Sequence, residues 1–347
     1  MLVAHAHDQA TFPAHHRQAD WKRRFALFSI AVGALLISVA GLFAWKHVSS
    51  PASYHYELGA VVPAGELDAW ASLAERQVVV RRASIIAADQ QPLAELELAE
   101  VSSGPVLLKW KSRVDDPFLT VGTSAQDVSA LAQVLQRHMP KDGLVLGWWD
   151  TSRQLQLLGG TPVRFGKHLG LPLFVPQRWR SQSADVESIE RAFWKAGNAG
   201  EERVQFQRFA NALLSDEASG MAELQAIAGG KPAVLVLHVR DAILLGQMDS
   251  RRLGVAFTDL GAMSDVHGMV RRVHDWLDHN QYPAYAMLQD KDSPVRAVAL
   301  TDAASGKTLA ARLLPFMGND QQDVAGATLV YRVGGFVVYE LAPQARP

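Results

Sequence analysis

The 347-residue sequence contains no cysteine. Disulfide bonds, thiolate metal sites and a cysteine nucleophile are therefore excluded. Covalent c-type haem is excluded as well, because its attachment needs a Cys-x-x-Cys-His motif. No cofactor is predicted, although a non-covalent cofactor held by His or Met stays open. A chain without cysteine suits an oxidising compartment such as the periplasm, where nothing can form a wrong disulfide.

An excess of basic residues is also absent. Lysine and arginine number 34 against 35 acidic residues, which gives a net charge of −1 and excludes the electrostatic footprint of a nucleic-acid-binding protein. Neither a Gly-x-Ser-x-Gly elbow nor a dinucleotide-binding glycine fingerprint occurs. Residues 304–308 end in Gly-Lys-Thr, but Thr301 replaces the first glycine of a phosphate loop, so they predict a turn. The sequence thus favours a non-enzymatic role.

Long uncharged apolar runs are missing except for one, at residues 25–45. As a helix this segment would rise about 31 Å, which matches the hydrocarbon core of a bilayer at about 30 Å. Small residues inside the run, with Trp21 and Trp45 near its two ends, are typical of a transmembrane helix. A buried core helix is the alternative. We expect a single membrane-spanning helix.

The distribution of basic residues predicts the orientation of that helix. Arg17, Lys22, Arg23 and Arg24 precede the run, whereas only Lys46 occurs in the twenty residues after it. The positive-inside rule places the N-terminus in the cytoplasm and the rest of the chain in the periplasm, with the helix in the bacterial inner membrane. A cleaved signal peptide is the alternative, but the run is longer than usual signal cores and no small-x-small cleavage site closes it.

The expected domains are a disordered, histidine-containing cytoplasmic tail (1–24), the transmembrane helix (25–45), a linker (46–64) and a periplasmic domain (65–347) with a possible sub-boundary near 181–185. Helices alternate with short apolar strands, which predicts an α/β fold with a mixed sheet, α+β being the alternative. The expected helices are 66–75, 124–139, 206–228, 264–279 and one from 150, and the expected strands are 77–81, 105–110, 144–149, 234–239, 285–288 and 295–300. Strands 327–333 and 336–341 flank Gly334-Gly335, which predicts a C-terminal antiparallel hairpin.

The most unusual segment is Trp148-Trp149-Asp150, followed in the next turn by Arg153. It stands where a buried strand ends and a helix begins, the position at which α/β sheets bind ligands. These four residues are the candidate ligand or partner site. In the other interpretation the tryptophans belong to the core and Asp150 only caps the helix.

Two segments carry candidate metal ligands. His274 and Asp278 lie four residues apart on a predicted helix and could share an ion, although a solvated helix face explains them as well. Asp115-Asp116-Pro117 is either a divalent-cation loop or an Asp-Pro turn. No catalytic residue is predicted.

Two resemblances arise from these motifs. Strand, Trp148-Trp149-Asp150 and then a helix resembles the Trp-Trp-Asp-Tyr-Gly segment of oligosaccharyltransferase catalytic subunits, which helps to bind the acceptor peptide. Thr151-Ser152 stands here in place of Tyr-Gly, and the many membrane helices of that family are missing. The resemblance therefore implies at most a similar extracytoplasmic fold.

The second resemblance covers most of the chain and is to the hydroxylamine oxidation protein HaoB of ammonia-oxidising and methane-oxidising bacteria. It rests on the N-terminal anchor and on the following segments: 147–154 (GWWDTSRQ), 168–179 (HLGLPLFVPQRW), 209–217 (FANALLSDE), 266–268 (VHG) with 275–277 (DWL), 280–285 (NQYPAY) and 329–339 (LVYRVGGFVVY). The resemblance implies a role in periplasmic hydroxylamine oxidation beside the multihaem hydroxylamine oxidoreductase. It carries over no catalytic residues.

The favoured function is therefore a membrane-anchored accessory protein of hydroxylamine oxidation, whose partner is hydroxylamine oxidoreductase or another periplasmic redox protein. One alternative is a cell-envelope enzyme or a glycan- or peptide-binding module that uses the Trp148-Trp149-Asp150 turn. A third is an assembly factor that leaves its partner after maturation.

Overall fold

The computed structural model describes residues 25, 28, 29, 32, 33, 36, 53–114, 122–171, 183–197, 199–261, 266–289, 295–320 and 323–343. The chain divides into two compact units, residues 1–51 and residues 52–347. The described residues of the first unit are helical, and Phe25, Phe28 and Leu36 among them are exposed. Within the residues that the structure describes, no helix is long and apolar enough to cross a membrane. Most of the predicted spanning segment lies outside those residues.

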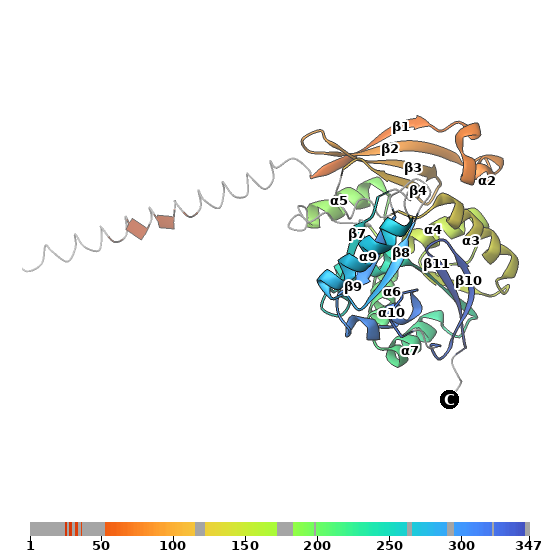
Figure 1. The fold of residues 1–347 in the computed structure, drawn as a ribbon. Coiled ribbons are helices and arrows are strands. Elements are labelled where there is room, and N and C mark those ends of the chain that lie inside the picture. Colours follow the sequence, from red (N-terminus) through yellow and green to blue (C-terminus); the bar gives the residue numbers. More distant parts are fainter. Residues whose placement is uncertain are drawn as a thin grey trace, which may run out of the picture. The chain divides into compact units, whose positions relative to one another are not determined.

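The second unit begins with an antiparallel sheet in the order β1-β2-β3-β4 (Figure 1). Its strands are β1 (Tyr54–Val61), β2 (Val79–Ala87), β3 (Pro92–Glu100) and β4 (Val106–Ser112). Short helical turns and α2 (Ala71–Glu75) connect β1 to β2. β1 lies inside the segment expected to be a linker, so that expectation is wrong over its eight residues. The reason is that β1 is the outer strand and mostly exposed, which leaves only a weak apolar pattern.

A mixed sheet in the order β10-β11-β6-β5 carries the parallel strands that the sequence predicts. β5 (Leu144–Gly147) and β6 (Ala233–His238) pair in parallel, whereas β11 (Phe336–Leu341) pairs antiparallel with β6 and with β10 (Ala327–Val333). The C-terminal hairpin is confirmed, because Val333 pairs with Phe336 across a two-residue turn. Gly334 has a φ of 51°, a left-handed conformation that favours glycine at this turn.

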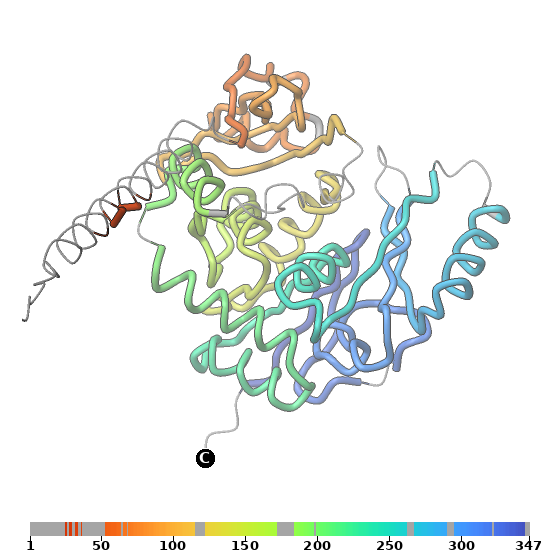
Figure 2. The backbone as a smooth tube through the Cα atoms, turned by 90° about the vertical axis from the view of Figure 1, so that its left-hand side faces the viewer, coloured from red at the N-terminus to blue at the C-terminus, as the bar shows by residue number. Residues whose placement is uncertain are grey.

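A third sheet is antiparallel and was not expected as a separate sheet. It has the order β7-β9-β8, formed by β7 (Val255–Asp259), β8 (Ala284–Leu288) and β9 (Arg296–Leu300). The amphipathic helix α9 (Val266–Asn280) buries Met269, Val273 and Leu277 in a small core with residues of β9. Figure 2 shows the backbone of α9 beside the strands of this sheet. The mixed α/β class is therefore confirmed, but the strands are distributed over three sheets.

The remaining helices pack around these sheets. They are α3 (Ala125–His138), α4 (Trp149–Gly159), α5 (Ser183–Phe193), α6 (Gly200–Leu213), α7 (Glu217–Ala228), α8 (Val239–Met248) and α10 (Leu309–Leu313). Ser124 caps α3 as expected, accepting a hydrogen bond from the Asp127 N–H. The single helix expected over 206–228 is two helices, because Asp216 caps a new one by accepting the Ser219 N–H at 3.0 Å.

Candidate functional site

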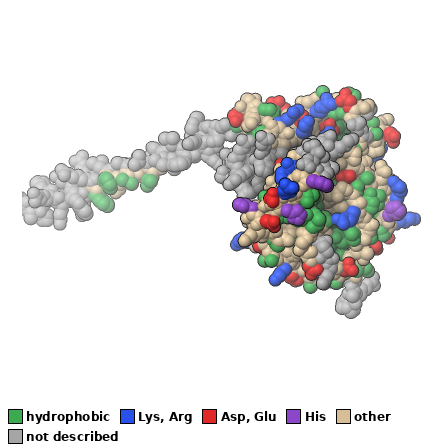
Figure 3. All heavy atoms as spheres, viewed as in Figure 1, with side chains coloured by type: hydrophobic (Ala, Val, Ile, Leu, Met, Phe, Trp, Pro, Cys, Tyr) green, Lys and Arg blue, Asp and Glu red, His purple; other side chains and the backbone are tan. Residues whose placement is uncertain are grey.

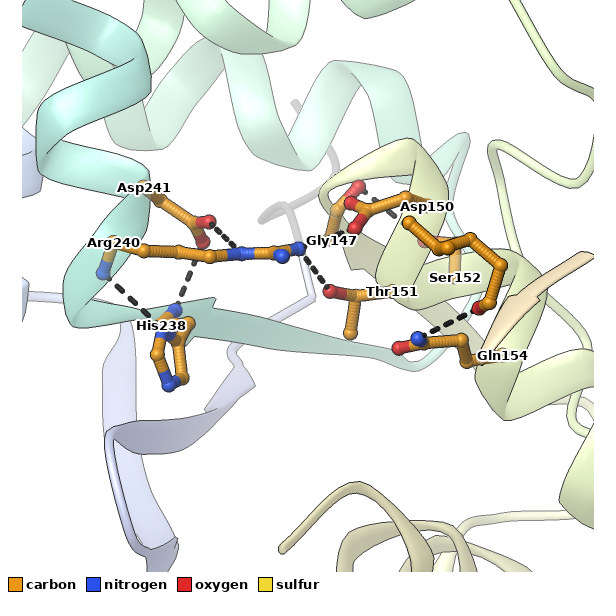
Figure 4. Close-up of polar contacts among 9 residues, drawn as sticks. Gly147, Asp150, Thr151, Ser152, Gln154, His238, Arg240 and Asp241 are labelled. Atoms are coloured by element: carbon orange, nitrogen blue, oxygen red, sulfur yellow. Dashed lines mark hydrogen bonds and ion pairs between the residues drawn. The ribbon is translucent and has the colours of Figure 1, made fainter. Parts of the chain in front are cut away.

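Two strand-to-helix turns lie side by side at one edge of the mixed sheet. β5 leads into α4, and β6 leads into α8. Because the two strands are parallel, with Gly147 opposite Val236, their carboxyl ends meet at this edge. Figure 4 shows the Arg240 side chain extending from the start of α8 towards Asp150 and Thr151 at the start of α4. The polar residues of both turns thereby form one cluster.

The centre of the cluster is a buried ion pair. The Arg240 Nη2 lies 2.5 Å from Asp150 Oδ2 and 3.0 Å from Thr151 Oγ1, and its Nε lies 3.7 Å from Asp241 Oδ1. The Asp150 and Arg240 side chains are each 3% exposed. Asp150 Oδ1, Arg240 Nε and Asp241 Oδ1 have no hydrogen-bond partner among the described residues. The pair therefore joins the first turns of α4 and α8 inside the protein, out of reach of solvent.

His238 lies at the turn from β6 into α8 and caps α8. Its Nδ1 accepts the Arg240 N–H at 3.1 Å, and Asp241 in return accepts the His238 N–H at 2.8 Å. Burial lowers the pKa of His238, and the positive charge of Arg240 adds to this effect. Burial raises the pKa of Asp241 to about 7, although Arg240 opposes the shift. An unprotonated Nδ1 is what the capping bond requires, so His238 is neutral.

The two predicted tryptophans lie in the core. The Trp148 ring packs edge-on against Phe206 at 5.0 Å between centroids, and the Trp149 ring does the same against His168 at 4.4 Å. Both are 4% exposed, so neither ring is open to a ligand in this conformation. The helix-cap interpretation of Asp150 is wrong, because the cap position is Trp148. Asp150 lies two residues after the cap, in the first turn of α4, where it faces Arg240.

Arg153 lines a pocket. It is buried in α4, and its Nη2 donates to the Gly104 carbonyl at 3.3 Å. Burial lowers the pKa of Arg153 to about 10, against the opposing charges of Asp150 and Glu202. The pocket beside it has a volume of about 840 Å³. The predicted group of four is thus split between the core, the ion pair and this pocket.

The candidate metal residues do not gather further ligands. His274 and Asp278 are both exposed on α9, and Figure 3 shows histidines among acidic and basic side chains on the face where α9 lies. In the part of the chain that is described, no group of three or more His, Cys, Asp or Glu residues could hold a metal ion. Asp115 and Asp116 lie outside the described residues. Residues 304–308 form the expected turn, in which Thr308 caps α10.

Two groups of buried polar residues in the structure were not predicted from the sequence. Arg240 and Asp241 follow directly after an apolar strand, and that abrupt change was an available signal. The second group joins β1 to α5: the Glu190 carboxylate accepts Tyr54 Oη at 2.5 Å and Tyr56 Oη at 2.6 Å. It also accepts the Trp194 Nε1 at 2.8 Å. Nothing in the sequence places Glu190 near β1.

Comparison with models of known protein families matches residues 20–341 to the family described as HaoA-associated protein HaoB. No curated protein and no solved structure matches the chain. The match covers nearly the whole sequence, including both turns of the polar cluster and the Arg153 pocket. The chain belongs to the HaoA-associated protein HaoB family.

Proposed function

We propose that this protein is an accessory protein of hydroxylamine oxidation that associates with the multihaem hydroxylamine oxidoreductase. The observation that carries the proposal is the family match over residues 20–341, because the family is described by its association with HaoA. The chain contains no cysteine and hence no covalent c-type haem. The haem-based redox chemistry then belongs to the partner.

The proposal includes a membrane anchor formed by residues 25–45, with the domain that follows in the periplasm. It is supported by the length of the apolar run and by the basic residues before it. The exposed positions of Phe25, Phe28 and Leu36 on helical backbone suit contact with lipid. Anchoring would raise the concentration of a soluble partner near the membrane, where its electrons must reach the quinone pool.

The test is co-elution. The full chain in mild detergent is mixed with hydroxylamine oxidoreductase of the same organism and passed through a size-exclusion column, with haem absorbance followed across the elution. We expect the haem to elute earlier with this protein than alone. Haem that elutes at the same position with and without it, in low and moderate salt, contradicts the proposal.

The alternative of an envelope enzyme or a glycan- or peptide-binding module at Trp148-Trp149-Asp150 has less support. Such a module stacks exposed aromatic rings on its ligand. Here both rings pack in the core, and Asp150 is engaged with Arg240. Arg153, which follows that turn, lines the pocket described above.

A further inference from the structure

The pocket beside Arg153 is built from Arg76, at the end of α2, and from four further parts of the second unit. They are the region of β4 (Val101, Ser103 and Val106), helix α4 (Arg153, Gln156 and Leu157), the segment 163–167, and the start of α6 (Ala199 to Gln205). The segment 163–167 is held in place, because the Arg164 N–H donates to the Val145 carbonyl of β5 at 2.9 Å. The pocket therefore has walls fixed by the sheet and by α4.

Positive charge predominates in this pocket. Arg76, Arg153, Arg164 and Lys167 line it, against the two carboxylates Glu201 and Glu202. Glu202 is already engaged, since it accepts the Lys167 N–H at 3.0 Å and lies 4.0 Å from the Lys167 ammonium. Glu201 is exposed. The positive charge of the pocket's basic side chains therefore exceeds the negative charge of its two carboxylates.

Two of these arginines have donors to spare. A guanidinium has five N–H donors. Arg153 is only 4% exposed, yet within the described residues it makes one hydrogen bond, to the Gly104 carbonyl at 3.3 Å. Arg164 Nε is buried and has no hydrogen-bond partner among them. Leaving such charged donors unpaired is costly, and an anion that accepts from them removes that cost.

The volume of the pocket and its remaining walls limit the size and chemistry of a ligand that fits it. At about 840 Å³ the pocket lies in the range of small-molecule sites, roughly 300–1,000 Å³. An inorganic oxyanion such as phosphate or sulfate is much smaller than this volume and would fill little of it. Val101, Val106, Leu157 and Val163 supply an apolar side.

From these observations we infer that the pocket binds a small organic anion, whose carboxylate or phosphate group is held by Arg153 and Arg164 and whose carbon skeleton lies against the valine and leucine walls. We expect this anion to bind whether or not hydroxylamine oxidoreductase is present. Binding is tested with this chain alone.

The experiment is a calorimetric titration of the full chain in mild detergent with succinate and with glycerol 3-phosphate, at an ionic strength held constant with sodium chloride. We expect saturable binding of at least one probe, and the stronger of the two identifies the preferred oxyanion. Arg164→Gln should weaken binding about tenfold or more, because a charge-assisted hydrogen bond is lost. Hydrogen exchange of residues 153–167 should slow when the probe is bound.

The matched control is Arg137→Gln, an exposed arginine on α3 that does not line the pocket. Binding by this variant should equal that of the unaltered chain. Arg153→Gln tests the buried arginine, and Arg164→Gln keeps the test valid if that variant fails to fold, because Arg164 is only half-buried. Failure of both probes to saturate, or equal binding by Arg164→Gln and the unaltered chain, overturns the inference.

Discussion

At the scale of single residues, the ion pair between Asp150 and Arg240 changes what a substitution at Asp150 should do. As a helix cap, Asp150→Ala would cost about 1 kcal/mol. In the structure the change removes the carboxylate that accepts from Arg240 Nη2 and leaves the guanidinium buried beside the more distant Asp241, at 3.7 Å. We therefore expect a loss of about 3 to 5 kcal/mol in the free energy of unfolding, measured by urea titration.

The control for this prediction is Asp216→Ala, which removes a true helix cap, on α7, at the surface. It should cost clearly less than Asp150→Ala. The double variant Asp150→Leu with Arg240→Met should recover most of the loss, because replacing a whole buried pair by apolar residues is often neutral. An Asp150→Ala variant as stable as Asp216→Ala would show that the pair contributes no more than a surface helix cap.

His168 gives a prediction about pH. Burial, with a smaller effect of the Arg153 charge, lowers the pKa of His168 to about 2, and its Nδ1 accepts the Gly170 N–H at 3.1 Å. Below about pH 6.5 the unfolded chain binds a proton at this histidine, whereas the folded chain does not. The free energy of unfolding therefore decreases as the pH falls below about 6.5. The substitution His168→Asn keeps a hydrogen-bond acceptor for the Gly170 N–H but removes the titrating imidazole.

We expect the stability of His168→Asn, relative to the unaltered chain, to rise by about 1.4 kcal/mol per pH unit below about pH 6.5. The relative value is needed because Asp241, with its raised pKa, changes stability in the opposite direction between about pH 4 and 7. Urea titrations at about pH 8, 6 and 5 measure it. His279→Asn, at an exposed ring on α9, is the control. A difference that is constant with pH contradicts the prediction.

At the scale of elements, β1 is held to α5 by hydroxyl groups. Tyr54 and Tyr56 both donate to Glu190, and the Tyr56 ring also stacks on Phe193 at 3.8 Å between centroids. Tyr56→Phe keeps the ring but removes one hydrogen bond to a buried carboxylate. We expect it to cost about 2 kcal/mol and to speed hydrogen exchange in β1.

The control on the same strand is His55→Ala, whose side chain is nearly half exposed and pairs with Glu57 at the surface. It should leave exchange in β1 close to that of the unaltered chain. If Tyr56→Phe and His55→Ala change the exchange of β1 equally, Glu190 is not what holds the strand.

Helices α6 and α7 meet at Gly220. A Cβ there would lie 2.4 Å from the Ala212 carbonyl oxygen and 2.7 Å from a methyl group of Leu309. The first of these is backbone and cannot swing away, so Gly220→Ala must separate the two helices. We expect a loss of about 1 to 3 kcal/mol in a thermal or urea unfolding experiment. Gly197→Ala, with no atom within 4 Å of the added Cβ, should not destabilise the protein.

Elements with strong periodicity were predictable from the sequence, and the others were not, for physical reasons. The hairpin of β10 and β11 and the capped helix α3 combine apolar periodicity with turn or cap residues. β3 (PLAELELAE) consists largely of helix-forming residues, and only its pairing between β2 and β4 makes it a strand. α8 follows β6 without a loop, which hides the change of period inside one apolar stretch.

At the scale of the whole molecule, the candidate site depends on contacts between distant parts of the chain. The sequence singled out Asp150 and Arg153, because polar residues follow a buried strand there. It could not identify Arg240, which lies 90 residues from Asp150 along the chain, since only the parallel pairing of β5 and β6 joins them. It also could not show that Trp148 and Trp149 would be covered, because burial follows from how α6 and the segment around His168 pack.

The proposed anchor also concerns the whole molecule, because it would determine where the remaining 300 or so residues are held. The full chain should stay with membranes through an alkaline carbonate wash. Arginine at the centre of a spanning helix costs about 2.5 to 3.5 kcal/mol, so Leu35→Arg together with Leu36→Arg should oppose insertion strongly and release the protein into the supernatant. Val204→Arg, at an exposed apolar position on α6, should leave the membrane fraction unchanged. Release of the unaltered chain by the wash would show that residues 25–45 do not anchor it, and the proposed placement beside the oxidoreductase at the membrane would fail with it.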